Sequence, residues 1–140
     1  METDDVVRLR RAVVRLARQL NTSATDEGLT PTQASVLGLI VGRGPVSPSE
    51  LAQAEHLNPT MLSRVIGRLE ELELISRSPG SEDARSFALS VTRAGKRVHE
   101  RIKAQRSAVL ADGVEALPAP SQAVLERALP VLEQLVAELS

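Results

Sequence analysis

With 140 residues the chain is long enough for one domain with its own core, and its lack of cysteine excludes disulfides, thiolate metal sites and cysteine redox sensing. No apolar run approaches the roughly 20 residues of a membrane-spanning helix, and the acidic start M-E-T-D-D lacks the apolar segment of a secretion signal, so we expect a cytoplasmic protein. The net charge of −1 is unusual for a nucleic-acid binder, for which a basic domain is the usual expectation.

The N-terminal segment predicts a helix over residues 5–22. Its apolar side chains recur at spacings of three and four, which is the spacing of a narrow heptad seam. Arginines flank the seam. So narrow a stripe favours packing against other helices, and both packing within the chain and dimerisation stay open. The seam consists of Val6, Leu9, Val13, Leu16 and Leu20.

Two short helices should follow, because the same start signal occurs twice. T-P-T-Q (30–33) and S-P-S-E (47–50) each place a capping hydroxyl before a proline at the first helical position, with Gln or Glu able to complete a capping box. The first helix should run to about Val41, where glycines follow. The second should end near His56.

The stretch from Leu57 to Ile75 predicts the helix around which the chain is organised. Asn58 can cap it and Pro59 suits its first position. With a rotation of about 100° per residue, one side of the helix carries apolar side chains. The other side carries small, hydroxyl-bearing and cationic side chains, which suit a helix that enters a DNA major groove. With the helix before it, this stretch forms a helix-turn-helix. The apolar side holds Leu62, Val65, Ile66, Leu69 and Leu72, and the outer side holds Thr60, Ser63, Arg64, Gly67 and Arg68.

A β-hairpin is predicted directly after this helix. Residues 74–77 are strand-like, residues 79–83 supply turn chemistry, and residues 86–91 alternate between apolar and polar side chains. The charged tip of the hairpin holds Arg85. A hairpin in this position is a wing, so the predicted fold class is mainly α with a small β wing.

Two further helices are expected in the C-terminal third. Thr92 should cap a helix that runs to about Asp112, before Gly113 and the L-P-A-P segment (117–120) break the chain. Its inner stripe is Ala94, Val98, Ile102, Gln105 and Val109.

The last helix should start at Ser121 and bend at Pro130. It carries a second heptad seam, and because the two seams lie at opposite chain ends, outside a winged lobe with its own core, they favour dimerisation. Packing within one chain stays open. The second seam consists of Leu125, Leu129, Leu132, Val136 and Leu139.

Charge is distributed unevenly along the chain. Residues 60–106 carry ten basic and six acidic side chains, whereas residues 107–140 carry one basic and five acidic side chains. Fifteen of the 17 basic residues are arginine, which suits phosphate and guanine contacts but could equally reflect a GC-rich genome. Because Phe87 is the only aromatic residue, base stacking is disfavoured and duplex DNA is the expected nucleic acid.

Other kinds of site are poorly supported. The only histidines, His56 and His99, form no convincing metal site without cysteine. No P-loop, G-x-S-x-G or H-E-x-x-H motif is present, and Glu70, Glu71 and Glu73 have the pattern of a solvated face. We therefore expect no enzymatic activity, metal or cofactor.

Six short segments, in this order and spacing, resemble one known family across essentially the whole chain. Each is weak alone, but together they are similar to the MarR family of winged helix-turn-helix transcriptional regulators. The segments are L-T-P-T-Q-A-S-V-L (29–37), S-E-L-A (49–52), T-M-L-S-R-V-I-G-R-L-E (60–70), L-I-S-R (74–77), D-A-R-S (83–86) and V-T-R-A-G (91–95).

The resemblance implies one MarR-type domain that acts as a homodimer on a palindromic operator in double-stranded DNA. Helices 5–22 and 120–140 would dimerise, 30–92 would form the winged lobe, and 93–112 would link them. Most members repress transcription, and many release DNA when a small aromatic or phenolic anion binds. The implied dimer residues are Val6, Leu9, Val13, Leu16, Leu125, Leu129, Leu132 and Val136.

The resemblance also implies the DNA contacts. Arg77 is the open case, because on the first wing strand it could equally be a solvated charge. The implied contacts are Pro59, Thr60, Ser63, Arg64 and Arg68 on the helix, Arg77 on the strand, and Asp83 and Arg85 at the wing tip. An anionic effector could meet Arg15, Arg18 and His99, where the first helix and the helix after the wing approach the lobe.

The sequence departs from the family pattern at two positions. Gly67 replaces a residue that is usually polar or acidic, and Ala84 replaces a charged residue beside the wing arginine. The lack of cysteine excludes the peroxide-sensing branch. A winged-helix module that binds protein instead of an operator is the alternative, which the near-neutral charge permits.

Overall fold

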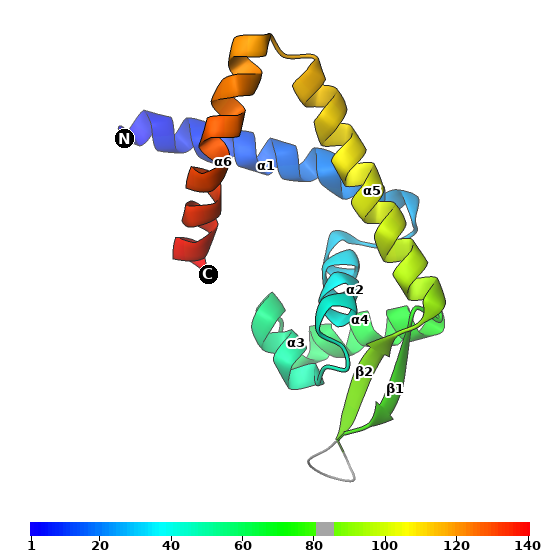
Figure 1. Cartoon of the computed structure of the whole chain (residues 1–140). Coiled ribbons are helices and arrows are strands. Elements are labelled where there is room, and N and C mark those ends of the chain that lie inside the picture. Colours follow the sequence, from blue (N-terminus) through cyan, green and yellow to red (C-terminus); the bar gives the residue numbers. More distant parts are fainter. Residues whose placement is uncertain (81–85) are drawn as a thin grey trace. The chain divides into compact units, whose positions relative to one another are not determined.

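The computed structural model describes residues 1–80 and 86–140, which are mainly helical with one small antiparallel sheet (Figure 1). The predicted fold class is confirmed. No helix in these residues is long and apolar enough to cross a membrane. In chain order the elements are α1 (Thr3–Asp26), α2 (Pro31–Arg43), α3 (Pro48–Glu55), α4 (Pro59–Glu71), β1 (Ile75–Pro79), β2 (Phe87–Val91), α5 (Arg93–Glu115) and α6 (Ala119–Leu139).

The described chain forms two compact units that divide within α5, at residues 106 and 107. The first unit contains α1 to α4, the sheet and most of α5. The second contains the end of α5 and all of α6.

The helix starts follow the caps expected from the sequence. The Thr30 hydroxyl accepts a hydrogen bond from the Gln33 backbone N–H at 3.1 Å, while the Gln33 side chain accepts one from the Thr30 N–H at 3.0 Å. Ser47 caps α3 through the Glu50 N–H, at 3.2 Å. These bonds satisfy N–H groups that a helix leaves without partners, so short local motifs fix where α2 and α3 begin.

A single hydrophobic core holds the first unit together. The predicted inner side of α4 is buried, and it packs with α2, α3, the sheet and the first half of α5. The largest fully buried side chains are Leu37, Ile40, Leu51, Leu69, Leu89, Val36 and Val46. This core presents the opposite side of α4 to solvent.

The sheet pairs β1 with β2, from Ile75 opposite Val91 to Pro79 opposite Phe87. A bridge between Val46 and Leu89 ties β2 to the loop before α3, with N···O distances of 3.0 and 2.8 Å. The first strand was predicted at 74–77 but occupies 75–79. Residues 79 and 80 were assigned to the turn, yet Pro79 pairs with Phe87 and the Gly80 N–H donates to the Ser86 carbonyl at 3.1 Å.

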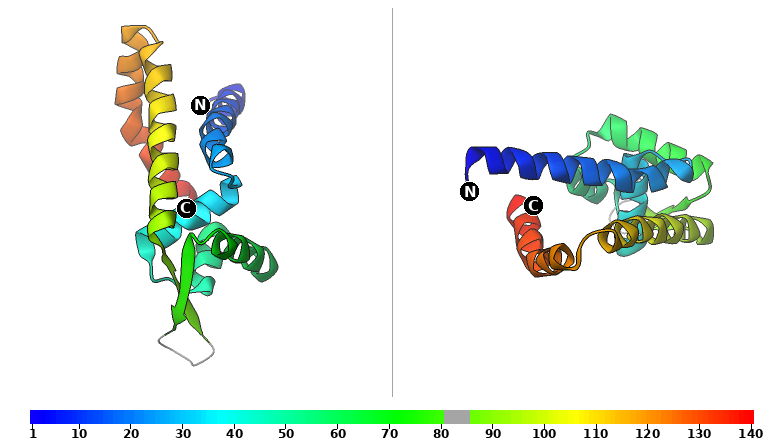
Figure 2. Two further views of the ribbon diagram at one scale, coloured as in Figure 1. Left: turned by 90° about the vertical axis from the view of Figure 1, so that its right-hand side faces the viewer. Right: turned by 90° about the horizontal axis from the view of Figure 1, so that it is seen from above.

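The long helices extend beyond their predicted limits. α1 is one unbroken helix of 24 residues (Figure 2). It continues through polar residues before the first and after the last residue of the apolar seam. α5 was predicted to end near Asp112, but it runs through Gly113 to Glu115, since a glycine without close neighbours is tolerated in a helix. Val98 and Ile102 of its predicted inner stripe are buried, whereas Gln105 and Val109 are exposed. α6 starts at Ala119, two residues before the predicted start.

Candidate nucleic-acid interface

The outward side of α4 carries the polar and cationic residues that the sequence predicted there. The Asn58 side chain accepts a hydrogen bond from the Met61 N–H at 2.8 Å, and Pro59 takes the first helical position. The opposite side is buried through Leu62, Val65, Ile66 and Leu69. All five predicted DNA contacts on this helix are exposed: Pro59, Thr60, Ser63, Arg64 and Arg68.

The two arginines of this surface differ in their surroundings. Arg68 forms an ion pair with Glu71, one turn along the helix, at 3.3 Å. Arg64 is exposed and forms no ion pair with any residue in 1–80 or 86–140. A guanidinium without a protein carboxylate can bond to two acceptors of a phosphate or a guanine. Of the two arginines, Arg64 is therefore the one whose guanidinium is available to an acceptor outside the protein.

Arg77, on β1 of the wing, connects the wing to α4. Its Nε donates to both Glu70 carboxylate oxygens, at 3.0 and 2.9 Å, and its NH2 group donates to Glu70 Oε1 at 2.8 Å. The guanidinium carbon lies 4.2 Å from the centroid of the Phe87 ring. Hydrogen bonding to Glu70 raises the pKa of Arg77 above its ordinary value. This arginine thus contacts α4 and β2 from its place on β1.

An open groove of ≈ 420 Å³ lies between α3, α4 and the two strands. Polar groups reach it from three directions: Ser49 and Gln53 from α3, Ser63 from α4, and Arg77 from β1. The sequence did not single out Ser49 or Gln53, although the S-E-L-A segment placed them on the helix before α4. It also assigned Glu70 to a solvated face, because no local spacing links a helix residue to a strand seven positions later.

The remaining predicted DNA contacts, Asp83 and Arg85, lie outside the described residues. Their proposed role at the wing tip therefore rests on the sequence. The described residues nearest to them in sequence are Gly80, which follows β1, and Ser86, which precedes β2.

The predicted dimer seams are exposed within their own units. In α1, Val6, Val13 and Leu16 are exposed and Leu9 is half-buried. No residue of α6 is buried, and its seam is exposed throughout. The exposed seam residues of α6 are Leu125, Leu129, Leu132, Val136 and Leu139.

The candidate effector residues are spread over α1 and α5. Arg15 and Arg18 are exposed on α1. His99 on α5 is half-buried against α2, where a Cβ on Gly38 would lie 3.3 Å from the imidazole Cε1. No hydrogen bond or ion pair joins these three side chains in the part of the chain that the structure describes. Whether they receive an anion stays a prediction.

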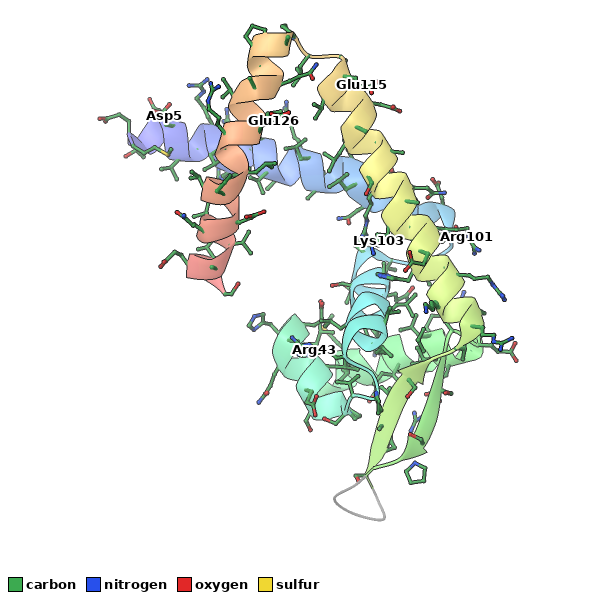
Figure 3. All side chains as sticks on the ribbon, in the orientation of Figure 1. Asp5, Arg43, Arg101, Lys103, Glu115 and Glu126 are labelled. Carbon is green, nitrogen blue, oxygen red and sulfur yellow. The ribbon has the colours of Figure 1, made fainter. Side chains whose placement is uncertain are left out.

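Charged and polar contacts connect α1 to α5 in the first unit. The guanidinium of Arg101, which Figure 3 labels on α5, donates to both carboxylate oxygens of Glu27 at 2.8 and 3.0 Å. This hydrogen bonding lowers the pKa of Glu27 below its ordinary value of 4.5. Arg106 donates to the Leu20 carbonyl at 3.3 Å and to Asn21 at 3.4 Å. The end of α1 is thus held against α5 at two points.

No group of three or more His, Asp or Glu side chains placed to hold a metal ion occurs among the described residues. The site presents exposed arginines and hydroxyls on α4 beside the groove. Such groups donate hydrogen bonds to phosphate oxygens and to base edges.

Comparison with known proteins shows which family and fold the chain is similar to. A model of the MarR family matches residues 29–87, which span α2 to the start of β2. An uncharacterised HTH-type transcriptional regulator of Mycobacterium leprae, ML2140, is 28% identical over 91% of this chain and 89% of its own length. The HTH-type transcriptional repressor MdtR of Bacillus subtilis is 30% identical over 69% of this chain and 63% of its own.

A solved structure extends the similarity to the whole fold. The crystal structure of RV1404 from Mycobacterium tuberculosis matches with a TM-score of 0.80 and 27% identity, covering 96% of this chain and 94% of that one. The match includes the winged lobe and the helices on both sides of it.

Proposed function

The chain belongs to the MarR family of transcriptional regulators, and we propose that it acts as a homodimeric repressor that binds a palindromic operator in duplex DNA. The observation that carries this proposal is the exposed outer side of α4 beside a two-stranded wing. Hydroxyls and arginines lie on a helix whose other side is fixed in the core. A rigidly held helix of this kind can place side chains against base edges in a major groove.

The proposed DNA contacts on α4 are Pro59, Thr60, Ser63, Arg64 and Arg68, and those of the wing are Asp83 and Arg85. Charge distribution supports this choice, because residues 60–106 hold ten of the 17 basic residues. The acidic excess lies in residues 107–140, which contain the predicted dimerisation helix 120–140 and none of the proposed DNA contacts. A net charge near zero is thus compatible with a cationic DNA surface.

Exposed apolar seams support the homodimer. Proteins that act alone rarely expose large contiguous apolar patches, and heptad seams are buried when they pair with other helices. The α6 seam remains uncovered within its unit, with Leu129 53% and Val136 65% exposed, and three of the five α1 seam residues are exposed. A second copy of the chain would cover them and would set the separation between two copies of α4.

Release by a small aromatic or phenolic anion is the regulatory part of the proposal. Arg15, Arg18 and His99 are its candidate contacts, from the two helices that join the dimer seam to the lobe. An anion held there would change how α1 and α5 meet. The proposed place of action is the cytoplasm, where the operator DNA of a bacterial or archaeal regulator lies.

A gel shift with the DNA upstream of the protein's own gene tests the proposal. Retardation at low salt should resist an excess of random DNA and should weaken in an Arg64→Ala variant. Arg97→Ala removes an exposed arginine from the surface of α5 and serves as the matched control. If no retardation occurs even at low salt, the winged-helix protein-binding module becomes the better account. Repeating the shift with a panel of aromatic acids tests the effector.

A further inference from the structure

We propose that Arg77 is a positioning residue that locks the wing to the recognition helix through Glu70 and Phe87, without itself contacting DNA. The inference rests on the proposed function, since it concerns how α4 and the wing are presented together. It assigns Arg77 a different role from the DNA contact that the sequence left open. It also gives a role to Glu70, which sequence analysis placed on a solvated face.

The turn after α4 brings the two charged groups together. Glu73 adopts a left-handed conformation with φ of 59°, and the Leu74 N–H donates back to the Leu69 carbonyl at 3.0 Å. This pattern closes the C-terminus of a helix and reverses the chain. Buried Leu74 and Ile75 then anchor the start of β1 in the core, so Arg77 returns alongside the last turn of α4.

The strand register places Arg77 on the inner side of the hairpin. Arg77 lies opposite Leu89, which is fully buried, and diagonally from Phe87, which pairs with Pro79. Directly opposed and diagonal residues of an antiparallel pair share one face of the sheet. Arg77 therefore lies on the face of the sheet that packs on the lobe. This position explains why its side chain can bond to Glu70.

The contacts of Arg77 span three elements. Three hydrogen-bond distances of 2.8–3.0 Å join it to α4, and its guanidinium stacks on a ring from β2. A planar guanidinium can donate paired hydrogen bonds to a carboxylate and stack on an aromatic ring at the same time. A lysine ammonium has no planar face to stack and no paired donors. The trio of Glu70, Arg77 and Phe87, here called the clamp, thus fixes the wing relative to α4.

Neutralising Glu70 separates positioning from direct contact, because the two roles predict opposite signs. If Arg77 contacted phosphate, Glu70→Gln would remove a competing carboxylate and tighten DNA binding. If the clamp positions the wing, Glu70→Gln should weaken operator binding by about 3- to 10-fold. Arg77→Lys keeps the positive charge but loses the paired hydrogen bonds, so it should weaken binding to a similar degree.

The experiment measures fluorescence anisotropy of labelled operator at several salt concentrations, for the parent, Glu70→Gln, Arg77→Gln and the double variant. If the clamp positions the wing, the double variant should bind operator no more weakly than the single variant with the lower affinity. The salt dependence of binding should be the same in all four proteins. A slope lower by about 1 in Arg77→Gln alone would show a phosphate contact and overturn the proposal. Glu73→Gln makes an equal charge change on an exposed side chain two residues after the end of α4, so it is the control and should not weaken binding.

Hydrogen exchange of the DNA-free protein tests the clamp even if no operator is found. The Gly80 amide, which bonds to the Ser86 carbonyl across the hairpin, should exchange faster in Glu70→Gln and not in Glu73→Gln. Equal exchange in the parent and Glu70→Gln would overturn the proposal. A parent protein that binds no DNA but shows this exchange difference would refute the proposed function and leave the clamp standing.

Discussion

Individual side chains on α4 have distinct tasks, and Arg64 is the one most directly suited to DNA. Replacing Arg64 by Ala should weaken operator binding by about 1–3 kcal/mol if the guanidinium makes a paired contact with a base. The free energy of unfolding should change little, because the side chain is exposed. Titration of operator and random DNA measures the effect. Equal affinity of parent and variant for both DNAs would show that this side of α4 is not the interface.

Gly67 is a second residue of the outer side of α4 with a specific expectation. A Cβ at this position would have no neighbour within 4 Å, so Gly67→Ala should fit the free protein. The free energy of unfolding should rise by up to about 1 kcal/mol, because Ala favours a helix more than Gly does. Urea unfolding measures this gain, and Gly113→Ala, equally open on α5, is the control.

The same variant shows whether Gly67 has a functional reason. If the DNA backbone approaches α4 closely at this point, Gly67→Ala should weaken operator binding while it stabilises the protein. Unchanged binding would mean that the glycine is incidental. A loss of stability would contradict the open surroundings that the structure gives it.

At the residue scale, the sequence predicted what depends on helical periodicity. Leu62, Val65 and Ile66 are buried and Arg64 is exposed because one period governs both sides of a helix. The pairing of Glu70 with Arg77 could not be predicted in this way. It depends on the left-handed turn at Glu73 and on the strand register, neither of which has a periodic signal.

At the scale of elements, the ion pair between Glu27 and Arg101 connects the end of α1 to α5. The hydrogen bonds from Arg101 lower the pKa of Glu27, so the folded protein favours the ionised carboxylate. This contribution to stability is fully present above the ordinary glutamate pKa and is lost as pH falls through the lowered pKa of the folded state.

Glu27→Gln should therefore lower the thermal stability at neutral pH, and the difference from the parent should shrink as the pH falls below the ordinary glutamate pKa of 4.5. Thermal unfolding followed by circular dichroism across this range measures it. Glu100→Gln removes an exposed carboxylate from the same turn of α5 and should leave the pH profile as in the parent. A constant difference at every pH would assign the effect of Glu27 to packing instead of charge.

The starts of the four capped helices, α2 to α5, were predictable, but several helix ends were not. Thr30, Ser47, Asn58 and Thr92 cap helices through bonds to residues three positions away, so all the information is local. The end of α1 lies in the polar segment N-T-S-A-T-D (21–26), where periodicity gives no limit. Gly113 was expected to stop α5, yet a helix accepts a glycine at modest cost when nothing else breaks it.

At the scale of the whole molecule, the account depends on pairing through the two seams. Leu129→Glu would place a carboxylate in the α6 seam of each copy and should weaken the dimer by at least about 2 kcal/mol. Light scattering over a range of protein concentrations measures the change. Gln134→Glu adds the same charge on the opposite side of α6 and should leave the mass unchanged. If the parent protein is monomeric at all concentrations, the seams do not form a dimer and serve packing within one chain.

The sequence predicts which surfaces would pair in the proposed dimer, but not how far apart its two copies of α4 would lie. Heptad spacing identifies a seam from the residues of one chain, whereas the separation of two copies of α4 depends on how two chains meet. That separation must match the turn of the double helix if the dimer is to use both copies at once.

Hydroxyl-radical footprinting of the protein on its operator shows whether two copies of α4 bind in successive major grooves. The account predicts two protected stretches related by a palindrome, with centres about 10 base pairs apart, and loss of both in Arg64→Ala. Insertion of about five base pairs between the half-sites should abolish paired protection, because it turns one half-site to the opposite face of the DNA. A single protected stretch, or paired protection that survives this insertion, would contradict a dimer that places two recognition helices in successive major grooves.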